Sequence, residues 1–335
     1  MVQMAVQTRM MAKCICRRII RCLSSISPVL TSKVLYRVIM GRKLDLTNPK
    51  TLNEKIMWLK LNTYRDNPLV IQCADKYRVR EYLASQGLSH IQIPLYYVYD
   101  NAESINWLDL PGSFVIKCNH GCGYNIICTD KAGLNIRDTE KQLRIWTKSE
   151  YWRRLAEINY RHIPHKIICE KYLSVENGSP PEDYKVYCFN GQARYVLVCV
   201  GRFAEKTFFY FFDEKWELAR INPDGIAAYD GFSLPEPAQL PNMLNCSAIL
   251  SRPFPFVRID YYVVNNDLYF GEMTFTPSAG LDKNRLPETD LLFGSMIDLN
   301  YASGVADDED GVFDQPQEQR RKKGAFARSN RAYPK

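Results

Sequence analysis

The stretch FVIKCNHGCGYNIIC, residues 114–128, predicts two strands joined by a glycine-containing loop. Side chains alternate along a strand, so Lys117 lies on the face opposite two of the apolar residues. A lysine on an inner face at a strand end needs an anionic partner. Gly121 and Gly123 allow backbone N–H groups to approach a phosphate closely. The stretch therefore predicts either a phosphate-binding lysine with its loop or a solvated strand end.

His120 lies within the same loop and either contacts a phosphate or an acceptor molecule or remains at the loop surface. Loops run over the protein surface, so we expect the surface position. The loop is not a Walker A motif, because its lysine precedes the glycines and no Lys-Ser/Thr pair follows.

The last predicted hairpin, VRIDYYVVNNDLYFGEMTF at residues 257–275, brings two carboxylates together. We expect a three-residue turn at 265–267, which pairs Asp260 directly with Glu272. Directly opposite residues have Cβ atoms about 4.5–5.5 Å apart. Two such carboxylates repel each other unless a cation joins them, and Mg²⁺ favours one or two carboxylates plus phosphate oxygens. A two-residue turn would instead place the two acids on opposite faces.

Arg258 offers a different arrangement for these acids. Each carboxylate would then pair separately with a nearby arginine such as Arg258. We expect Arg258 to point to the face opposite its neighbour Asp260, and so not to lie at the metal.

Two further strands carry candidate ligands. Asp183, Lys185 and Tyr187 recur at period two and share one face, so Lys185 either contacts the same phosphates or pairs with Asp183 across a wet surface. Glu170 ends the apolar run KIICE, and residues 171–173 follow. A strand that leaves the sheet there offers N–H and C=O groups to an adenine, with the acid at its exocyclic amine. A solvated strand end is the other interpretation.

Helices and strands are interspersed along the chain, and most strands belong to antiparallel hairpins, which indicates an α+β class. Helices are predicted at 51–64, 74–86 and 136–160, and Thr51 with Glu54 forms a capping box at the start of the first. Strands are predicted in HIQIPLYYVY, SFVIKCN, YNIICT, HKIICEKYL, DYKVYCFNGQARYVLVCV, TFFYFFD and VRIDYYVVNNDLYFGEMTF.

Positive charge is concentrated at the two ends of this 335-residue chain, whose net charge is +7. Residues 1–43 carry basic residues and no acid, and the tail after Asp314 is also basic. This distribution disfavours a nucleic-acid groove and predicts either contact with an anionic surface or solubilising ends. No apolar run reaches membrane-spanning length, and residues 29–40 fit a short basic amphipathic helix lying on a membrane surface.

The eleven cysteines contain no CxxC pair and no regular framework. Cys169, Cys188 and Cys199 lie inside apolar strands, so we expect buried free thiols in a reducing cytosol.

Six stretches, in their order along the chain, resemble the ATP-grasp superfamily and within it the TupA-like family, which is linked to teichuronopeptide and polysaccharide biosynthesis. They are TLNEKIMWLK, ADKYRVREYL, FVIKCNHGCG, CEKYL, DYKVYCFNG and VRIDYYVVNNDLYFGEMTFTPSAGL, and the match covers roughly residues 44–298. The resemblance implies two α+β lobes with mostly antiparallel sheets that clasp ATP. Together with the charge at the two ends, it divides the chain into a basic extension (1–43), a helical segment (44–112), a first lobe (113–173), a second lobe with the carboxylates (174–300) and a disordered acidic and basic tail (301–335).

The resemblance also implies roles for individual residues. Lys76, Lys117 and Lys185 bind the phosphates of ATP, and Lys117 and Lys185 act in catalysis. Thr274 stands where many members have Asn, and its hydroxyl binds the metal directly or through water. The further implied ligands are His120, Gly121 and Gly123 in the loop over the triphosphate, Glu170, Lys171, Tyr172 and Leu173 at adenine, Glu176 at ribose, and Asp260 and Glu272 at Mg²⁺.

The chemistry that the resemblance implies is ADP-forming carboxylate–amine ligation. A carboxylate attacks the γ-phosphate to give an acylphosphate, and an amine then displaces phosphate. The implied substrates are a carboxylate and an amine from a glycan or amino-acid pool. The implied location is the cytoplasm, with peripheral contact at the inner face of the membrane through the basic ends.

Three other functions remain open. A glycosyltransferase of polysaccharide biosynthesis needs a nucleotide-sugar site, often with a DxD metal motif, and the acidic cluster of Asp307, Asp308 and Asp310 is low-complexity tail sequence. A kinase would keep the ATP cleft and phosphorylate a sugar hydroxyl. A non-enzymatic polyanion-binding protein would use the basic ends.

Overall fold

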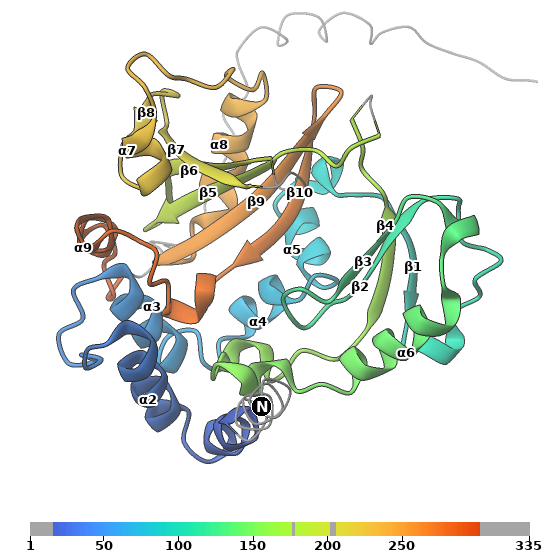
Figure 1. Cartoon of the computed structure of the whole chain (residues 1–335), viewed down its shortest axis with the longest axis horizontal. Coiled ribbons are helices and arrows are strands. Elements are labelled where there is room, and N and C mark those ends of the chain that lie inside the picture. Colours follow the sequence, from blue (N-terminus) through green and yellow to red (C-terminus); the bar gives the residue numbers. More distant parts are fainter. Residues whose placement is uncertain (1–15, 176–177, 202–205, 302–335) are drawn as a thin grey trace, which may run out of the picture. The chain divides into compact units, whose positions relative to one another are not determined.

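The computed structural model describes residues 16–175, 178–201 and 206–301, which form two antiparallel β-sheets with helices packed around them (Figure 1). Within these residues the smaller sheet has four strands in the spatial order β1-β4-β2-β3. Its strands are β1 (Leu95–Tyr99), β2 (Phe114–Cys118), β3 (Asn125–Cys128) and β4 (Ile167–Lys171). Antiparallel sheets with inserted helices confirm the predicted α+β class.

The larger sheet has six strands among the described residues, in the order β10-β9-β5-β6-β7-β8. They are β5 (Asp183–Phe189), β6 (Gln192–Val200), β7 (Phe208–Asp213), β8 (Leu218–Ala219), β9 (Phe256–Val264) and β10 (Asp267–Thr274). All seven residues of β5 are buried, including Asp183 and Lys185. Charged residues inside a buried strand must find partners within the fold, so β5 carries a polar cluster into the protein.

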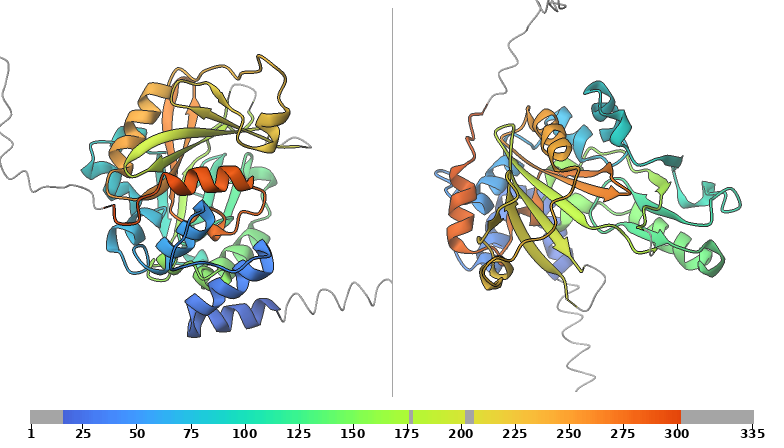
Figure 2. Two further views of the ribbon diagram at one scale, coloured as in Figure 1. Left: turned by 90° about the vertical axis from the view of Figure 1, so that its left-hand side faces the viewer. Right: turned by 90° about the horizontal axis from the view of Figure 1, so that it is seen from above.

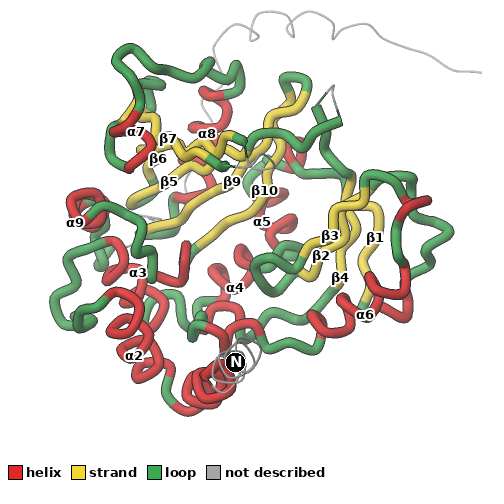
Figure 3. Tube along the Cα trace, viewed as in Figure 1, coloured by secondary structure: helices red, strands yellow, loops and turns green. Residues whose placement is uncertain are grey.

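Helices flank both sheets (red in Figure 3), and residues 16–26 form a helix that is followed directly by α2 (both blue in Figure 2). The remaining helices are α2 (Pro28–Met40), α3 (Leu52–Leu61), α4 (Pro68–Ala74), α5 (Val79–Ser85), α6 (Ile136–Thr147), α7 (Pro223–Ala227), α8 (Leu240–Ser251) and α9 (Pro287–Ser295). Short 3-10 helices occur at Ser89–Ile91, Ala102–Ser104, Lys131–Gly133, Tyr151–Arg154, Ile158–Tyr160 and Pro277–Gly280.

The larger sheet is covered on both faces. The rings of Tyr187 and Phe189 in β5 pack against Phe293 of α9, with ring centroids 5.7 and 5.4 Å apart. On the other face, the Ser247 hydroxyl of α8 donates to the Tyr261 hydroxyl of β9 at 3.0 Å. Neighbouring residues of a strand point to opposite faces. One face of the sheet therefore packs against α8, and the other packs against α9 and also carries the polar cluster of β5.

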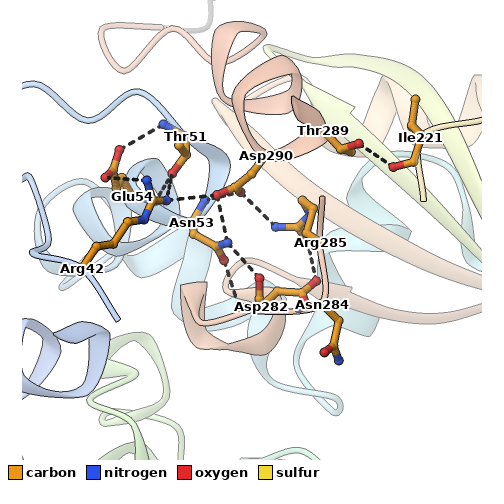
Figure 4. Close-up of polar contacts among 10 residues, drawn as sticks. All are labelled: Arg42, Thr51, Asn53, Glu54, Ile221, Asp282, Asn284, Arg285, Thr289 and Asp290. Atoms are coloured by element: carbon orange, nitrogen blue, oxygen red, sulfur yellow. Dashed lines mark hydrogen bonds and ion pairs between the residues drawn. The ribbon is translucent and has the colours of Figure 1, made fainter. Parts of the chain in front are cut away.

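A buried polar network fastens α3 to α9 and to the segment before α9 (Figure 4). The backbone N–H of Asn53 donates to Asp290 Oδ1 at 3.0 Å, and its side-chain amide donates to Asp290 Oδ2 at 3.1 Å. Asn53 also exchanges hydrogen bonds with the backbone of Asp282. Arg285 and Arg42 form ion pairs with Asp290 at 3.4 and 3.5 Å. We call these residues the α3–α9 network.

The segment 74–86 does not form the single helix that its sequence predicts. The chain leaves the helix at residue 75 and re-enters it at residue 79. The Asp75 carboxylate accepts hydrogen bonds from the backbone N–H groups of Tyr77 (2.8 Å) and Arg78 (3.3 Å), which stabilises a turn in place of a helix. Lys76 therefore lies in a turn between two short helices.

The other predicted helices also end earlier than expected. Thr51 and Glu54 form the predicted capping box of α3, which ends at Leu61. The segment 136–160 is helical only to Thr147 and continues as two 3-10 helices. The hairpin predicted within DYKVYCFNGQARYVLVCV is confirmed, with its turn at Asn190-Gly191.

Several global expectations can be compared with the structure. Cys169, Cys188 and Cys199 are buried free thiols, as predicted. Among the described residues, none of the helices has the length and hydropathy needed to cross a bilayer. The predicted disordered tail lies outside the described residues, apart from Tyr301.

Candidate functional site

Two adjoining cavities lie where the β2–β3 loop meets the larger sheet. The sheet cavity, about 390 Å³, is lined by Lys76, Lys117, Cys122, Gly123, Tyr124, Asn125, Asp183, Lys185, Arg258, Asp260, Tyr262, Gly271 and Glu272. The edge cavity, about 260 Å³, is lined by Ile93, Val115, Ile127, Glu170–Leu173, Pro180 and Pro181 together with shared residues. Both include Lys117, Asn125, Asp183 and Tyr262, so the two cavities form one continuous cleft.

Asp260 and Glu272 face each other as predicted, but the turn and the strand register that bring them together differ from the prediction. The β9–β10 turn contains two residues, Asn265 and Asn266, whose φ values are +50° and +65°. The predicted three-residue turn is therefore wrong. Asparagine tolerates positive φ values, so these two residues can form a tight two-residue hairpin turn. The register skips Gly271, so this residue forms a β-bulge and Glu272 pairs with Asp260. The bulge restores the pairing that a regular two-residue hairpin would lose.

Arg258 lies at these carboxylates, and the expectation that it points to the opposite face is wrong. Residues two apart in a strand share a face. Its Nε and Nη2 atoms lie 2.7 and 2.8 Å from the two oxygens of Asp260, and Nη2 lies 3.8 Å from Glu272. Nη2 also donates to the Thr274 hydroxyl at 3.1 Å.

The electrostatics of Glu272 are set by its cationic neighbours. Burial alone would raise the pKa of this carboxyl, but the charges of Lys76, Arg258 and Lys185 outweigh burial and lower the pKa to about 2. Lys76 Nζ lies 3.1 Å from Glu272 Oε2. Glu272 is therefore a carboxylate at neutral pH, and this carboxylate lines the sheet cavity.

Lys185 is held between two buried acids of the larger sheet. Its Nζ lies 2.5 Å from Asp260 Oδ2 and 3.2 Å from Asp183 Oδ2. All three side chains are at most 10% exposed, so the pairing with Asp183 across a wet surface is wrong. Burial would lower the pKa of Lys185, but the charge of Asp260 outweighs it and raises the pKa.

Glu170 binds cations of its own chain. Its carboxylate lies 2.5 Å from Lys117 Nζ and 3.6 Å from Arg80 Nη1. Residues 171–173 line the edge cavity beside it. The structure thus brings the strand exit to a cavity, while the acid holds Lys117 at the junction of the two cavities.

Lys76 connects the glycine loop to the larger sheet. Its Nζ donates to the Gly121 carbonyl at 2.9 Å and pairs with Glu272, and its backbone N–H donates to the Asn119 carbonyl at 3.2 Å. Burial would lower its pKa, but Glu272 outweighs burial and raises it. The lysine is protonated at neutral pH and fixes the loop against β10.

His120 is buried and points away from the cleft, so its expected surface position is wrong. Its ring stacks on His165 with centroids 3.6 Å apart, and Nε2 lies 3.2 Å from the carbonyl oxygens of Trp146 and Ser149. Burial, and then His165, lower the pKa of His120 to about 4. The imidazole anchors the loop to the segment after α6.

The two loop glycines have different reasons to be glycine. A Cβ at Gly121 would lie 2.7 Å from the Tyr151 ring, so this position needs the absence of a side chain. Gly123 has φ +74° and lines the sheet cavity. Only Gly123 is placed where its backbone faces the cleft.

Sequence reasoning missed two cleft residues, Asn125 and Tyr262, and misplaced a third, Arg258. It also missed Arg80, which pairs with Glu170. Asn125 pairs with Lys117 across β2 and β3, and Tyr262 pairs with Asp183 across β9 and β5. The alternation of side chains along the strands could have placed Arg258 and both paired residues in the cleft. Glu176 lies outside the described residues.

The carboxylates fit a metal that is shared with a ligand. Among the described residues, no cluster of three or more His, Cys, Asp or Glu side chains is arranged to hold a metal ion. Asp260 and Glu272 nevertheless offer oxygen atoms to one cavity, and Mg²⁺ commonly takes one or two carboxylates plus phosphate oxygens. The donor set therefore fits Mg²⁺ brought together with a phosphate-bearing ligand.

Comparison with known proteins places this geometry in a family. The family model for "TupA-like ATPgrasp" matches residues 54–298. A D-alanine–D-alanine ligase from Bacillus anthracis, in complex with ATP, is similar in structure at 18% identity with a TM-score of 0.41, covering 68% of this chain and 65% of that one. An L-amino acid ligase from Bacillus licheniformis is similar at 11% identity with a TM-score of 0.43, covering 76% and 56%. The chain thus spans less than two thirds of the length of either ligase. No curated protein sequence matches it.

Proposed function

Because the chain belongs to the TupA-like ATP-grasp family, we propose that it is an ATP-dependent, ADP-forming ligase that joins a carboxylate to an amine. The observation that supports this best is the cleft itself. Lys76, Lys117 and Lys185 line it together with the strand-paired carboxylates Asp260 and Glu272. Cations beside a pair of carboxylates suit a triphosphate with its metal.

In this proposal ATP lies along the continuous cleft. Adenine occupies the edge cavity beside Lys171, Tyr172 and Leu173, with Glu170 behind them, and Glu176 takes the ribose. The triphosphate lies in the sheet cavity, where the three lysines offset its charge. The loop that contains Gly121 and Gly123 closes over it, anchored by His120.

Asp260 and Glu272, with the Thr274 hydroxyl, would hold Mg²⁺, which would supply positive charge beside the phosphates of ATP. The carboxylates are preorganised for this role by protein cations. Arg258 holds Asp260 through two hydrogen bonds, and Lys76 orients Glu272. The cations also lower the pKa of Glu272, so this carboxyl is ionised before ATP enters.

The reaction has two steps. An oxygen of the substrate carboxylate attacks the γ-phosphorus, the bond from that phosphorus to the bridging oxygen breaks, and ADP leaves. An amine nitrogen then attacks the carbonyl carbon of the acylphosphate, phosphate leaves, and the nitrogen loses a proton. Lys117 and Lys185 position the γ-phosphate and offset its charge, so the protein contributes mainly positioning and electrostatics.

We propose a role in polysaccharide or teichuronopeptide biosynthesis, with substrates from a glycan or amino-acid pool. The support is the family to which the chain belongs. A glycosyltransferase and a sugar kinase are the alternatives that the following experiment separates.

The test measures ADP release by the purified protein with Mg-ATP and a panel of carboxylates and amines. We expect release to depend on both substrates and Glu272→Gln to lower it by about 100-fold or more, since it removes a preorganised charge at the phosphates. Glu236→Gln, in an exposed loop, is the matched control and should leave the rate unchanged.

The product decides between the alternatives. An amide confirms ligation, whereas a phosphoester supports a kinase. Sugar transfer from a nucleotide sugar without ADP release would refute the ligase. Loss of ATP binding on deletion of residues 1–43 would instead support a polyanion-binding protein that relies on its basic end.

We further propose that the protein works in the cytoplasm with α2 against an anionic membrane. Leu30, Val34 and Val38 recur at helical spacing and are 49%, 37% and 75% exposed. Lys33 and Arg37 lie beside this apolar stripe. A basic amphipathic helix of this kind binds an anionic interface.

Co-sedimentation with vesicles tests this location. Vesicles with phosphatidylglycerol should retain the protein better than phosphatidylcholine vesicles, and Val38→Glu should weaken retention. Equal retention on both vesicles would contradict the proposal.

A further inference from the structure

A third cavity, about 460 Å³, lies between the helix at 16–26 and the 3-10 helix that follows α6. We call it the N-terminal cavity. Its polar wall consists of Arg17, Arg21, Arg154 and Tyr151, and Leu35 of α2 and Leu155 contribute apolar surface. Figure 2 shows the helix at 16–26 and α2 as the adjacent blue segments.

The N-terminal cavity adjoins the proposed phosphate site. Cys122 of the glycine loop lines both this cavity and the sheet cavity. Its side chain is exposed, so the loop residue forms a boundary between two open spaces and not a filled wall. Cys122 therefore stands between the N-terminal cavity and the end of the cleft that contains Glu272 and Lys76.

The wall of this cavity is cationic. The described residues that line it include three arginines and no aspartate or glutamate. Within the described part of the chain, Arg17, Arg21 and Arg154 form no ion pair, and Arg154 packs over the Tyr151 ring at 5.4 Å from its centroid. The neighbouring acid Glu157 is buried, accepts a hydrogen bond from the Thr276 hydroxyl, and interacts electrostatically with Arg154.

The arrangement of the arginines favours carboxylates. Arg17 and Arg21 are one helical turn apart, so they lie on the same face of their helix. A guanidinium group presents a planar fork of donors that matches a carboxylate, and such charge-assisted pairs are the strong ones. Three guanidinium groups around one cavity exceed the need of a single carboxylate.

We propose that the N-terminal cavity binds the carboxylate substrate and that this substrate carries at least two carboxylates. One carboxylate reaches past Cys122 to the γ-phosphate, and the others bind Arg17, Arg21 and Arg154. This inference rests on the proposed ligase function and adds its substrate class, an oligocarboxylate, and the residues that select it. The N-terminal helix then belongs to the substrate site.

The test begins with binding, which needs no turnover. Isothermal titration of the full chain uses trigalacturonate and triglutamate as oligocarboxylate probes, with galacturonate as a probe that has one carboxylate. The wild type should bind at least one triacid about tenfold or more tightly than galacturonate. The better triacid identifies a sugar or a peptide backbone.

Variants locate the site. Arg17→Gln with Arg21→Gln, and separately Arg154→Gln, should weaken binding of that triacid by about tenfold or more, because charged hydrogen bonds are lost. Arg18→Gln is the matched control on the same helix, outside the cavity lining, and should leave the affinity within about twofold. Affinity for Mg-ATP should be unchanged in all variants.

The outcomes separate the two proposals. If the wild type binds Mg-ATP and releases ADP but no triacid binds better than galacturonate, the oligocarboxylate inference is refuted and the ligase stands. The inference also fails if Arg18→Gln weakens triacid binding as much as the cavity variants do. If Mg-ATP does not bind at all, the ligase proposal fails, whatever the triacid result.

Discussion

Two groups of ion pairs in this protein use the same chemistry in different surroundings. In the α3–α9 network, Asn53 and Asp290 are buried and directed at each other and at backbone atoms, and neither lines one of the three cavities described above. Lys76, Asp260 and Glu272 also form ion pairs, but each of them lines the sheet cavity. The polar atoms of the first group are satisfied by partners within the network, whereas the second group presents polar atoms to a cavity.

This difference indicates what each group of charges does. Removing one partner of a closed, buried network leaves donors that no other group can satisfy, so stability falls. In the cavity, water or a ligand can take the place of a lost partner. Substitutions in the first group should therefore lower stability, and substitutions in the second should lower ligand binding at a smaller cost in stability.

The largest effect is expected for Asp290→Ala. It leaves the backbone N–H of Asn53 without its acceptor and removes one of the two acids that pair with Arg285, so the free energy of unfolding should fall by about 3–5 kcal/mol. Urea unfolding measures this loss, with Glu288→Gln, an exposed residue of the same helix, as control. A loss below about 1 kcal/mol would show that the network is not the closed cluster described here.

Lys76→Met tests the other group. We expect the dissociation constant for Mg-ATP to rise about tenfold or more, because a charged donor at the triphosphate is lost. The free energy of unfolding should fall by only about 1 kcal/mol, since Glu272 keeps Arg258 nearby. Titration and urea unfolding measure the two effects, and Lys215→Met, at an exposed turn, is the control. Severe destabilisation with unchanged ATP affinity would remove the distinction between the two groups.

Gly271→Ala sharpens the comparison within the cavity group. A Cβ at this position would lie 2.9 Å from the Asp260 carbonyl oxygen and 3.1 Å from the Tyr262 ring. The bulge must then shift, which should cost about 1–3 kcal/mol of stability and displace Glu272. Urea unfolding and the rate of ADP release should both decrease, whereas Gly133→Ala, which meets no atom within 4 Å, should change neither.

The effect that is smallest near neutral pH concerns His120. The pKa of His120 is about 4 in the folded protein and near 6.5 in an unfolded chain, because burial and His165 disfavour its charge. The unfolded state therefore binds more protons between pH 6.5 and 4, and the free energy of unfolding falls as pH decreases through this window.

His120→Gln removes this titration and keeps a donor for the Trp146 and Ser149 carbonyls. The contribution of about 1 kcal/mol per pH unit within the window should disappear from urea unfolding curves measured across it. His90→Gln, at an exposed site, should keep the wild-type slope. An unchanged slope for His120→Gln would mean that His120 is protonated in the folded protein.

Features that depend on neighbouring residues could be predicted from the sequence, and features that depend on distant residues could not. The capping box of α3, the hairpin strands and the α+β class follow from local spacing. The burial of His120 depends on His165, which is 45 residues away, and a single loop contains no signal for it. Pairing of Glu170 with Arg80 likewise requires the fold.

Three errors could have been avoided with the same rules. Residues at period two share a face, and that rule puts Arg258 beside Asp260. Asp75 stands at the point where the helix over 74–86 is interrupted, and an aspartate side chain can stabilise a turn by accepting from nearby backbone N–H groups. A glycine inside a strand pattern also indicates a bulge, and Gly271 was such a glycine.

Gly271 also determines how this hairpin tolerates a change in length. Asp260 and Glu272 face each other because one residue between them is left out of the ladder, not because of how many residues separate them. Deletion of Gly271 would turn β9 and β10 into a regular two-residue hairpin with the same two acids opposite each other. Pulling Gly271 into the ladder would turn Glu272 to the opposite face. An inserted residue at this point of β10 therefore leaves the two acids opposite each other when it stays outside the hydrogen-bonded register. When the inserted residue pairs with β9, it turns one acid away from the cavity.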